Sequence, residues 1–309
     1  MLFTKPCFIF VVSIGSKKYD TMNIIQIYKQ FPTEQHCIAH LENARWKGEP
    51  TCPYCKSKQV SSVEKENRYH CNTCNTSFSV TVGTIFHNTK LDLQKWFLAI
   101  TLVLNAKKGI SSRQLSRDIE VNKDTAWRML MQIRKSMVHD GEMLQGIVEA
   151  DETYIGGKNK NRHNDKKTKG GQGRGGDDKT PVFGVLERGG KVKAGKVKDV
   201  TAKTLKGMIK RFVTVGSSLM TDEWRAYNGL SNAYNHSVVS HGSGQYVNGI
   251  AHTNTLEGFW SLLKRGIIGQ YHYVTPKYLN RYIDEFCYRY NNRLTVNLFE
   301  QTILKSVNA

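Results

Sequence analysis

Residues 252–266 read HTNTLEGFWSLLKRG, and the fold of the chain depends on how this stretch is interpreted. Its apolar residues recur at helical spacing, which predicts a helix that begins near Asn254 and packs one face against a core. A polar stripe runs beside that face and comprises Asn254, Glu257, Ser261 and Lys264. An acid and a lysine on one helix suit metal-dependent phosphodiester chemistry. The alternative is structural, with Asn254 as the helix cap and Glu257 as its partner three residues later.

Upstream of this helix, the sequence from residue 146 predicts three strands, a helix over residues 201–212, a fourth strand, a second helix and a fifth strand over residues 234–239. Asp151 is expected to end the first strand, and Asp222 to end the fourth, a short strand at residues 218–221. The order of elements is that of a ribonuclease H-like fold, in which acids on adjacent strands meet an acid on a later helix. Asp151, Asp222 and Glu257 could then hold two Mg²⁺ ions, which take oxygen ligands.

Three further acids flank the two aspartates, and we interpret them as structural or peripheral: Glu149, Glu152 and Glu223. Trp260 and an aromatic stripe near the C-terminus are expected to belong to the core.

The composition indicates a polyanionic partner. Among 309 residues, 45 Lys and Arg oppose 26 Asp and Glu, a net charge of +19, which favours a nucleic-acid partner. The sequence shows no long basic amphipathic helix of the kind that would indicate a membrane partner. The apolar run at residues 7–14 is too short to span a bilayer, and we expect translation to begin at Met22.

A helix-turn-helix is predicted within residues 89–140, with helices over 112–119 and from Lys123 onward. The second helix carries the expected DNA-contacting side chains: Lys123, Thr125, Arg128 and Arg134. A second candidate contact surface is the Lys- and Gly-rich loop at 156–180, which suits phosphate binding. Its candidate residues are Lys166, Lys167, Lys169 and Arg174. A scaffold pair of helices and a solvated linker are the respective alternatives.

Two cysteine pairs predict a zinc ribbon over residues 51–88. Cys52 and Cys55 are separated by fifteen residues from Cys71 and Cys74, a C-x2-C-x15-C-x2-C spacing. Four thiolates complete a tetrahedral shell, so the zinc ion would be structural. Such cysteine usage is typical of a reducing compartment.

Taken together, these motifs resemble the bacterial insertion-sequence transposases of the DDE superfamily, in the ISXO-type, Merlin-related group with an N-terminal zinc ribbon. The resemblance covers nearly everything from Met22 onward. It is carried by CPYC at 52–55, EADETYIGG at 149–157, TDEW at 221–224, HTNTLEGFW at 252–260 and YRYNNR at 288–293. The expected fold is an α/β (α+β) multidomain chain. Its predicted segments are a leader (1–21), an N-terminal helical segment (22–50), the zinc ribbon, the helix-turn-helix region and a ribonuclease H-like domain with a mixed sheet (145–295).

The resemblance implies DNA strand transfer with Mg²⁺ or Mn²⁺. It makes Asp151 and Asp222 the first two metal ligands and Lys264 the accompanying basic residue. Glu257 is the expected third ligand, and Asn254 is the other candidate, because this position varies in related groups. The expected partners are double-stranded DNA, as transposon ends and target, and further copies of the chain in a synaptic complex. A cytoplasmic, nucleoid-associated location follows. A nuclease that cuts without joining and an inactive DNA-binding regulator are the rival interpretations.

Overall fold

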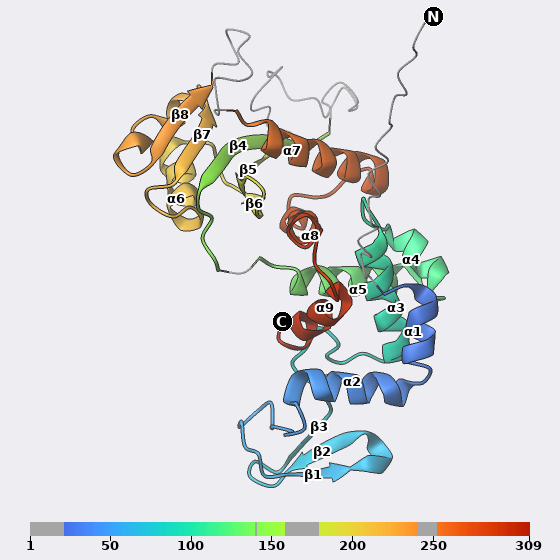
Figure 1. The fold of residues 1–309 in the computed structure, drawn as a ribbon. Coiled ribbons are helices and arrows are strands. Elements are labelled where there is room, and N and C mark those ends of the chain that lie inside the picture. Colours follow the sequence, from blue (N-terminus) through green and yellow to red (C-terminus); the bar gives the residue numbers. More distant parts are fainter. Residues whose placement is uncertain (1–21, 140, 158–178, 240–251) are drawn as a thin grey trace, which may run out of the picture.

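The computed structural model describes residues 22–139, 141–157, 179–239 and 252–309, and Figure 1 shows an elongated molecule. A three-stranded sheet lies at one end, a bundle of helices in the middle, and a five-stranded sheet with its own helices at the other end. The predicted leader and four predicted phosphate contacts lie outside the described residues: Lys166, Lys167, Lys169 and Arg174. Within the described part of the chain, no helix is long and apolar enough to cross a membrane.

The five-stranded sheet confirms the prediction of a ribonuclease H-like domain with a mixed sheet. Its strands are β4 (Ile147–Gly156), β5 (Lys179–Glu187), β6 (Val192–Lys196), β7 (Ser218–Asp222) and β8 (Asn235–Val239). They lie in the order β6-β5-β4-β7-β8, and β7 is parallel to both β4 and β8, whereas β4, β5 and β6 are antiparallel. Glu149 pairs with Met220 in the β4–β7 register. Asp151 and Asp222, each two residues further along, therefore occupy neighbouring positions where this pairing ends. Asp222 ends β7 as predicted, whereas Asp151 lies within β4 rather than at its end, because β4 continues to pair with β5.

Helices cover both faces of this sheet. The helix α6 (Ala202–Phe212) packs on one face, and α7 (Asn254–Gly266) and α8 (Leu279–Asn291) pack on the other. The helix α7 begins at Asn254, as predicted, and buries its apolar stripe against the strands. The helices α7 and α8 approach closely at Gly266, where the missing side chain leaves room for the ring of Phe286; a Cβ atom there would overlap this ring.

The helical bundle combines segments from both ends of the chain. Its helices are α1 (Ile24–Gln30), α2 (Glu34–Trp46), α3 (Leu93–Asn105), α4 (Ser112–Asp118), α5 (Lys123–Ser136) and α9 (Leu298–Val307). One hydrophobic core joins them, and α9 packs beside α2, α3 and α5. The segments predicted over 22–50 and 89–140 thus share a core, which α9 completes after α8 has led the chain back from the sheet (Figure 1).

The helices α4 and α5 form the predicted helix-turn-helix. Each begins with a capping side chain: Ser111 accepts a hydrogen bond from the backbone N–H of Gln114, and Asn122 accepts one from Thr125. Lys123 and Arg128 are exposed on α5, and Thr125 between them is half-buried. These three side chains occupy the N-terminal half of the second helix, the part that reads DNA in such motifs.

Arg134 does not fit the predicted DNA-contacting surface. Its side chain is 1% exposed and forms an ion pair of 2.6 Å with Glu285 of α8. Its guanidinium also stacks 4.0 Å from the ring of Tyr282. The prediction was wrong because Arg134 lies on the face of α5 that packs against α8, where a buried charge requires a partner.

The ribbon at the far end is a three-stranded antiparallel sheet. Its strands are β1 (Val60–Val63), β2 (Arg68–Cys71) and β3 (Thr76–Phe78). Trp46, at the end of α2, packs edge-on against Tyr69 and Phe78 of this sheet. This contact attaches the ribbon to the bundle.

Candidate active site

A cleft of about 890 Å³ lies between α7, the sheet and the connection from α3 to α4. Four acidic side chains line it: Asp151, Glu152, Asp222 and Glu257. Three basic side chains line it as well: Lys108, Lys264 and Arg265. The predicted acids from β4, β7 and α7 thus reach one cavity, and cations occupy other parts of its wall.

Asp151 lies at the centre of a group of interacting side chains in the cleft. Burial raises the pKa of its carboxyl to about 7, and the nearby carboxylates of Glu152 and Asp222 add to the effect. The indole N–H of Trp260 donates a 3.0 Å hydrogen bond to Asp151 Oδ2. Trp260 belongs to the core, as expected, and also orients this acid. Gly184 of β5, paired with Asp151, makes room for the indole, because a Cβ there would lie 2.6 Å from Trp260 Cη2.

Asp222 and Glu152 complete the strand side of the cleft. Asp222 is the last residue of β7, is 5% exposed, and accepts a 3.0 Å hydrogen bond from the backbone N–H of Trp224. Glu152 accepts a 2.7 Å hydrogen bond from the hydroxyl of Tyr227 and is also buried. Glu152 was interpreted as structural or peripheral, yet it lines the same cleft as the two aspartates.

The polar stripe of α7 divides into two parts. Glu257, Ser261 and Lys264 line the cleft, whereas Asn254, which is exposed at the start of the helix, is not among the lining residues. Glu257 Oε1 accepts a 2.9 Å hydrogen bond from the hydroxyl of Thr253. Thr253, not Asn254, occupies the N-cap position of α7, and its side chain makes no capping hydrogen bond to the helix backbone.

Lys264 lies close enough to Asp151 for the two charges to interact. Partial burial lowers the pKa of the Lys264 ammonium, the charge of Asp151 opposes this change, and nearby Lys179 reinforces it. Lys264 and Asp151 thus line the same cleft, and the role of Lys264 beside the acids stays a prediction.

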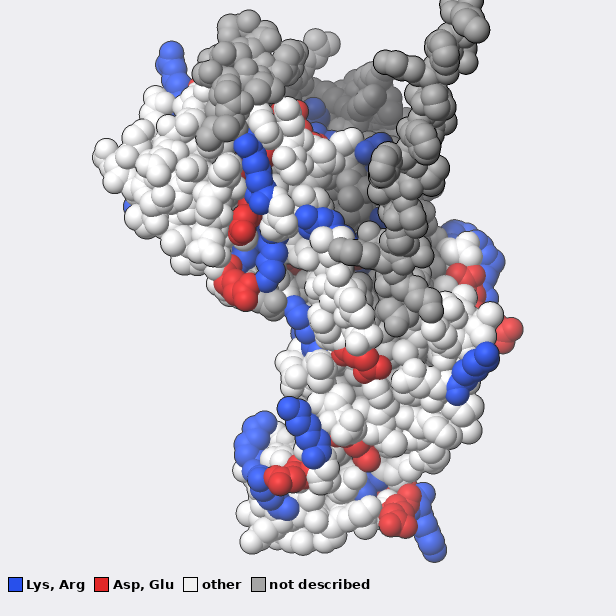
Figure 2. Space-filling model, in the orientation of Figure 1, with Lys and Arg blue, Asp and Glu red and all other residues white. Residues whose placement is uncertain are grey.

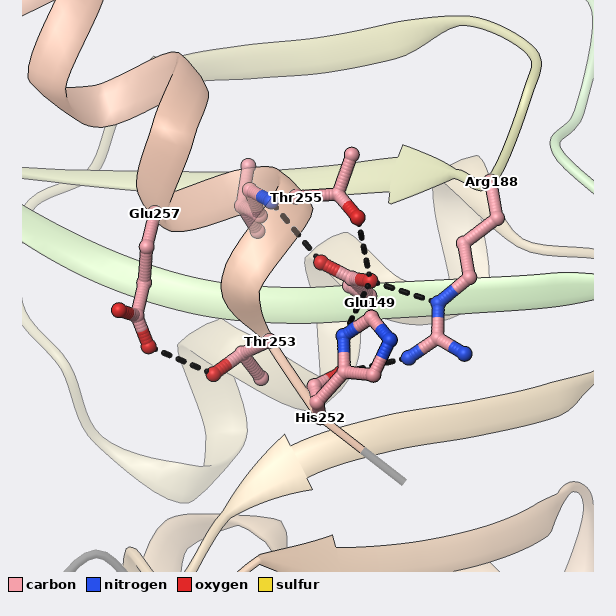
Figure 3. Close-up of polar contacts among 7 residues, drawn as sticks. Glu149, Arg188, His252, Thr253, Thr255 and Glu257 are labelled. Carbon is pink, nitrogen blue, oxygen red and sulfur yellow. Dashed lines mark hydrogen bonds and ion pairs between the residues drawn. The ribbon is translucent and has the colours of Figure 1, made fainter. Parts of the chain in front are cut away.

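Glu149 fixes the beginning of α7, as Figure 3 shows. This acid is fully buried and accepts hydrogen bonds of 2.9 Å from the hydroxyl of Thr255 and the backbone N–H of Leu256. Arg188 donates to it at 2.7 Å, and His252 Nδ1 lies 3.3 Å away. The sequence predicted only a structural or peripheral acid here. In the structure Glu149 holds the start of α7, the helix that carries Glu257, against β4.

The acidic cleft fits hard divalent cations in its chemistry. Carboxylate oxygens are the ligands that Mg²⁺ prefers, and three acids from separate elements line this cleft. Their oxygens are not clustered within 4.8 Å; in the described part of the chain, only the four cysteines form such a group of three or more ligands. The cleft is thus an open site, whose ligands need not converge on a single ion.

The four cysteines fit a structural zinc ion. The sulfur atoms of Cys52, Cys55, Cys71 and Cys74 all lie within 4.8 Å of one another. Each pair is followed by a residue with positive φ, Lys56 at 63° and Asn75 at 59°, whose backbone N–H bonds back to the first cysteine of the pair. The backbone N–H of Cys74 lowers the pKa of the Cys71 thiol to about 6, although burial opposes it. This favours the thiolate that zinc requires.

On the face shown in Figure 2, lysines and arginines stand singly or beside acids over both halves of the molecule. Thr125 and Arg128 line a second cavity of about 270 Å³ between α5 and the segment that precedes α3. Sequence reasoning missed Lys108 as a lining residue of the acidic cleft; no local motif marks it, because only the fold brings it there.

Comparisons with known proteins agree with this geometry. The family model described as ISXO2-like transposase domain matches residues 143–291, and the one described as transposase zinc-ribbon domain matches residues 32–77. A protein of Halobacterium salinarum, described as an uncharacterized protein in transposable element ISH50, is 31% identical over 249 residues. The match covers 77% of this chain and 84% of that protein.

Two solved structures show a weaker likeness. A chain of the pre-cleavage Mos1 transpososome is 13% identical with a TM-score of 0.27, over 68% of this chain and 75% of that one. A chain of the simian T-cell lymphotropic virus intasome in complex with the PP2A regulatory subunit B56 gamma is 13% identical with a TM-score of 0.26, over 54% and 57%. TM-scores this low add nothing to what the order of the strands shows.

Proposed function

This chain belongs to the family of ISXO2-like transposases, and we propose that it cleaves DNA at the ends of its insertion sequence and transfers the freed strands to target DNA. Family membership gives the class of reaction. The observation that carries the assignment of residues is the approach of Asp151, Asp222 and Glu257 to one cleft from two strands and a helix.

In this proposal, Asp151, Asp222 and Glu257 hold Mg²⁺ or Mn²⁺ through their carboxylate oxygens. When bound, the ions activate the attacking water or 3′-hydroxyl and neutralise charge on the leaving oxygen. Lys264 contacts the DNA backbone beside the acids. Asn254 remains the other candidate for the third ligand, but its position outside the cleft lining favours Glu257.

Two supporting residues keep this arrangement in register. The N–H of Trp260 orients Asp151, and the contacts of Glu149 fix the start of α7 relative to β4. The acids therefore keep their separation while the backbone of the substrate enters. Such hydrogen bonds around metal ligands commonly affect metal affinity or activity 10- to 100-fold.

Double-stranded DNA is the proposed partner. The zinc ribbon and the helix-turn-helix bind the terminal inverted repeats, with Lys123, Thr125 and Arg128 directed at the duplex. The basic tract at 156–180 follows flanking or target DNA. Because two ends must be joined, the active form is a homo-oligomer, at least a dimer, that works on nucleoid DNA in the cytoplasm.

The test uses the purified full-length protein, duplexes that carry the ends of the element, and a target plasmid. Asp151→Asn and Asp222→Asn should each lower Mg²⁺-dependent cleavage at least ~10³-fold and leave end binding nearly unchanged. Glu223→Gln is the matched control, because Glu223 adjoins Asp222 but is exposed and outside the cleft lining. Cleavage by Glu257→Ala and Asn254→Ala then ranks the two candidates for the third ligand.

Three outcomes would contradict the proposal. Cleavage without joined product would indicate a nuclease, and binding without cleavage would indicate a regulator. Cleavage that survives Asp151→Asn would show that the metal site has been assigned to the wrong residues.

A further inference from the structure

The helical bundle contributes one side chain to the acidic cleft. Lys108 lies in the connection between α3 and α4, whereas the other lining residues among those described come from the sheet domain, from position 151 onward. The side chain is exposed and makes no ion pair with any described residue. The bundle and the catalytic acids therefore meet at this cavity.

The backbone next to Lys108 is closely seated. Gly109 has a φ of 91°, a conformation that favours glycine. A Cβ atom at this position would overlap the hydroxyl of Tyr271 and would lie 3.3 Å from Glu285 Oε1. No other residue type fits between these two side chains without displacement. The backbone at Lys108 is thus held in place by the packing of Gly109 against Tyr271 and Glu285.

The seat under Gly109 is a buried ionic cluster that joins three elements. Tyr271 ends the π-helical turn η7 (Ile267–Tyr271), which continues α7, and Glu285 lies on α8. Arg134 of α5 donates to Glu285 at 2.6 Å and to the Tyr271 hydroxyl at 3.2 Å. Burial alone would raise the pKa of Glu285, but the charges of Arg134 and Arg289 hold it below its ordinary value. The cluster therefore stays ionised and ties the recognition helix α5 to the extension of α7.

We propose that Lys108 binds a phosphate of the DNA backbone within the acidic cleft. The helix-turn-helix region would thereby supply, from its own α3–α4 connection, a cation that helps to hold the strand at the catalytic acids. The proposal rests on the function proposed above, because a phosphodiester is then the substrate of this cleft. Lys264 and Arg265 on α7 provide positive charge from another element, so the backbone would be held by cations from both domains.

The seating contacts make Tyr271 and Arg134 positioning residues for Lys108. Arg134 of α5 donates a hydrogen bond to the hydroxyl of Tyr271, and this hydroxyl lies against Gly109 in the loop that carries the lysine. The helix α5 is the one expected to bind the end of the insertion sequence. These contacts connect α5 rigidly to the loop of Lys108. When α5 binds the correct DNA, Lys108 is therefore already placed in the cleft. A cut should accordingly require that the bundle and the sheet domain hold the same duplex.

The central experiment compares Lys108→Ala with Lys107→Ala, since Lys107 is the exposed neighbour outside the cleft lining. With end duplex at saturating concentration, Lys108→Ala should slow single-turnover cleavage about 10- to 100-fold, the range expected for a lost charge-assisted contact. Affinity for the end should change about 2-fold or less, and Lys108→Arg should restore most of the rate. The proposal would be overturned if Lys108→Ala cleaved as fast as the wild type, or if Lys107→Ala lost as much of the cleavage rate as Lys108→Ala.

Cross-linking provides a readout that does not depend on turnover. Lys108→Cys, labelled with a photoactivatable aryl azide, should cross-link to the strand at the cleavage junction, and labelled Lys107→Cys should not. Both are made in the Asp151→Asn background, so the DNA stays intact. A cross-link from both positions, or from neither, would contradict the contact.

Failure of this inference can be separated from failure of the proposed function. If cleavage depends on Asp151 and on Mg²⁺ but not on Lys108, only the present inference is wrong. If Asp151→Asn still cleaves, the assignment of the catalytic site is wrong, whatever the result for Lys108. Tyr271→Phe keeps the ring under Gly109 and removes its hydroxyl. A positioning role predicts that it weakens the cross-link from position 108, with no change in zinc content or end affinity.

Discussion

The two sites that suit metal ions are built in opposite ways. The zinc ribbon takes its ligands from two short knuckles, and its four sulfur atoms lie within 4.8 Å of one another. The acidic cleft takes Asp151, Asp222 and Glu257 from β4, β7 and α7, far apart in the chain, and leaves space between them. The first arrangement closes around one ion and stabilises a fold. The second leaves room for a substrate beside the three acids, which is what the proposed catalytic role requires.

The two sites also differ in how their surroundings shift the pKa of the side chains: it is lowered at Cys71 and raised at Asp151. In the ribbon, the N–H of Cys74 lowers the pKa of the Cys71 thiol to about 6. In the cleft, burial and two neighbouring acids raise the pKa of Asp151 to about 7. At Cys71 the backbone N–H groups stabilise the thiolate, whereas around Asp151 the neighbouring carboxylates concentrate negative charge that favours a bound cation.

Removal of a zinc ligand should have the largest effect and should leave the cleft intact. Cys71→Ser is expected to lose the zinc ion and unfold the ribbon, because the binding of structural zinc contributes roughly 10–16 kcal/mol in small zinc domains. Zinc content by mass spectrometry and end binding should both fall. Asp222→Asn is the reciprocal control and should keep its zinc. If Cys71→Ser kept zinc and bound ends normally, the assignment of the four ligands would be wrong.

The next largest effect tests whether a distant anchor maintains the cleft. Glu149→Ala removes a buried acid and leaves Arg188 without this partner, so we expect a loss of ~3–5 kcal/mol in stability. Thermal unfolding, followed together with Mg²⁺-dependent cleavage, would measure both consequences. Glu223→Ala, a change at an exposed acid, should alter unfolding little. An unchanged unfolding midpoint for Glu149→Ala would show that α7 does not depend on this contact.

The same contrast explains what the sequence could predict. The ribbon followed from the spacing of Cys52, Cys55, Cys71 and Cys74 alone, because knuckle geometry is local. The succession of the five strands along the chain and the start of α7 also followed from periodicity, but the helix predicted between β7 and β8 is instead two 3-10 turns, η4 (Arg225–Tyr227) and η5 (Leu230–Asn232). Asp151 and Asp222 could be proposed as neighbours because the order of elements was that of a ribonuclease H-like fold, and the parallel β4–β7 pair does bring them together.

Features that depend on tertiary packing could not be predicted in this way. Arg134 resembled a DNA contact, because the sequence does not show that α8 covers that face of α5. Lys108 carried no motif, and α9 was not foreseen as part of the N-terminal bundle. Glu149 and Asp151 occupy alternate positions of one strand and both contact α7, yet one anchors the helix and the other lines the cleft. Their roles depend on which part of α7 lies opposite each of them.

A smaller effect is expected where a neighbouring side chain orients a metal ligand. Trp260→Phe keeps an aromatic ring in the core and removes the N–H that donates to Asp151. Cleavage should fall about 10- to 100-fold, and the apparent Mg²⁺ requirement should rise, with zinc content and end binding unchanged. Titration of cleavage against Mg²⁺ concentration measures this. A variant with the Mg²⁺ dependence of the wild type would show that the hydrogen bond is dispensable.

The smallest effect tests burial as the cause of a raised carboxyl pKa, at a residue outside both sites. Burial raises the pKa of Asp284 on α8 to about 6, and Arg281 opposes this change. The folded protein therefore binds more protons than the unfolded chain between about pH 4 and pH 6, so this carboxyl lowers stability as the pH rises through that window. Asp284→Asn should raise stability by about 1–2 kcal/mol above pH 6, after allowance for partial exposure, with no difference below pH 4. Thermal unfolding midpoints at pH 4, 5, 6 and 8 would measure the difference, and equal midpoints at pH 8 would show that burial alone does not perturb a carboxyl in this protein. The raised pKa of Asp151 would then have to come mainly from Glu152 and Asp222, which would make charge crowding, rather than desolvation, the feature that separates the cleft from the ribbon.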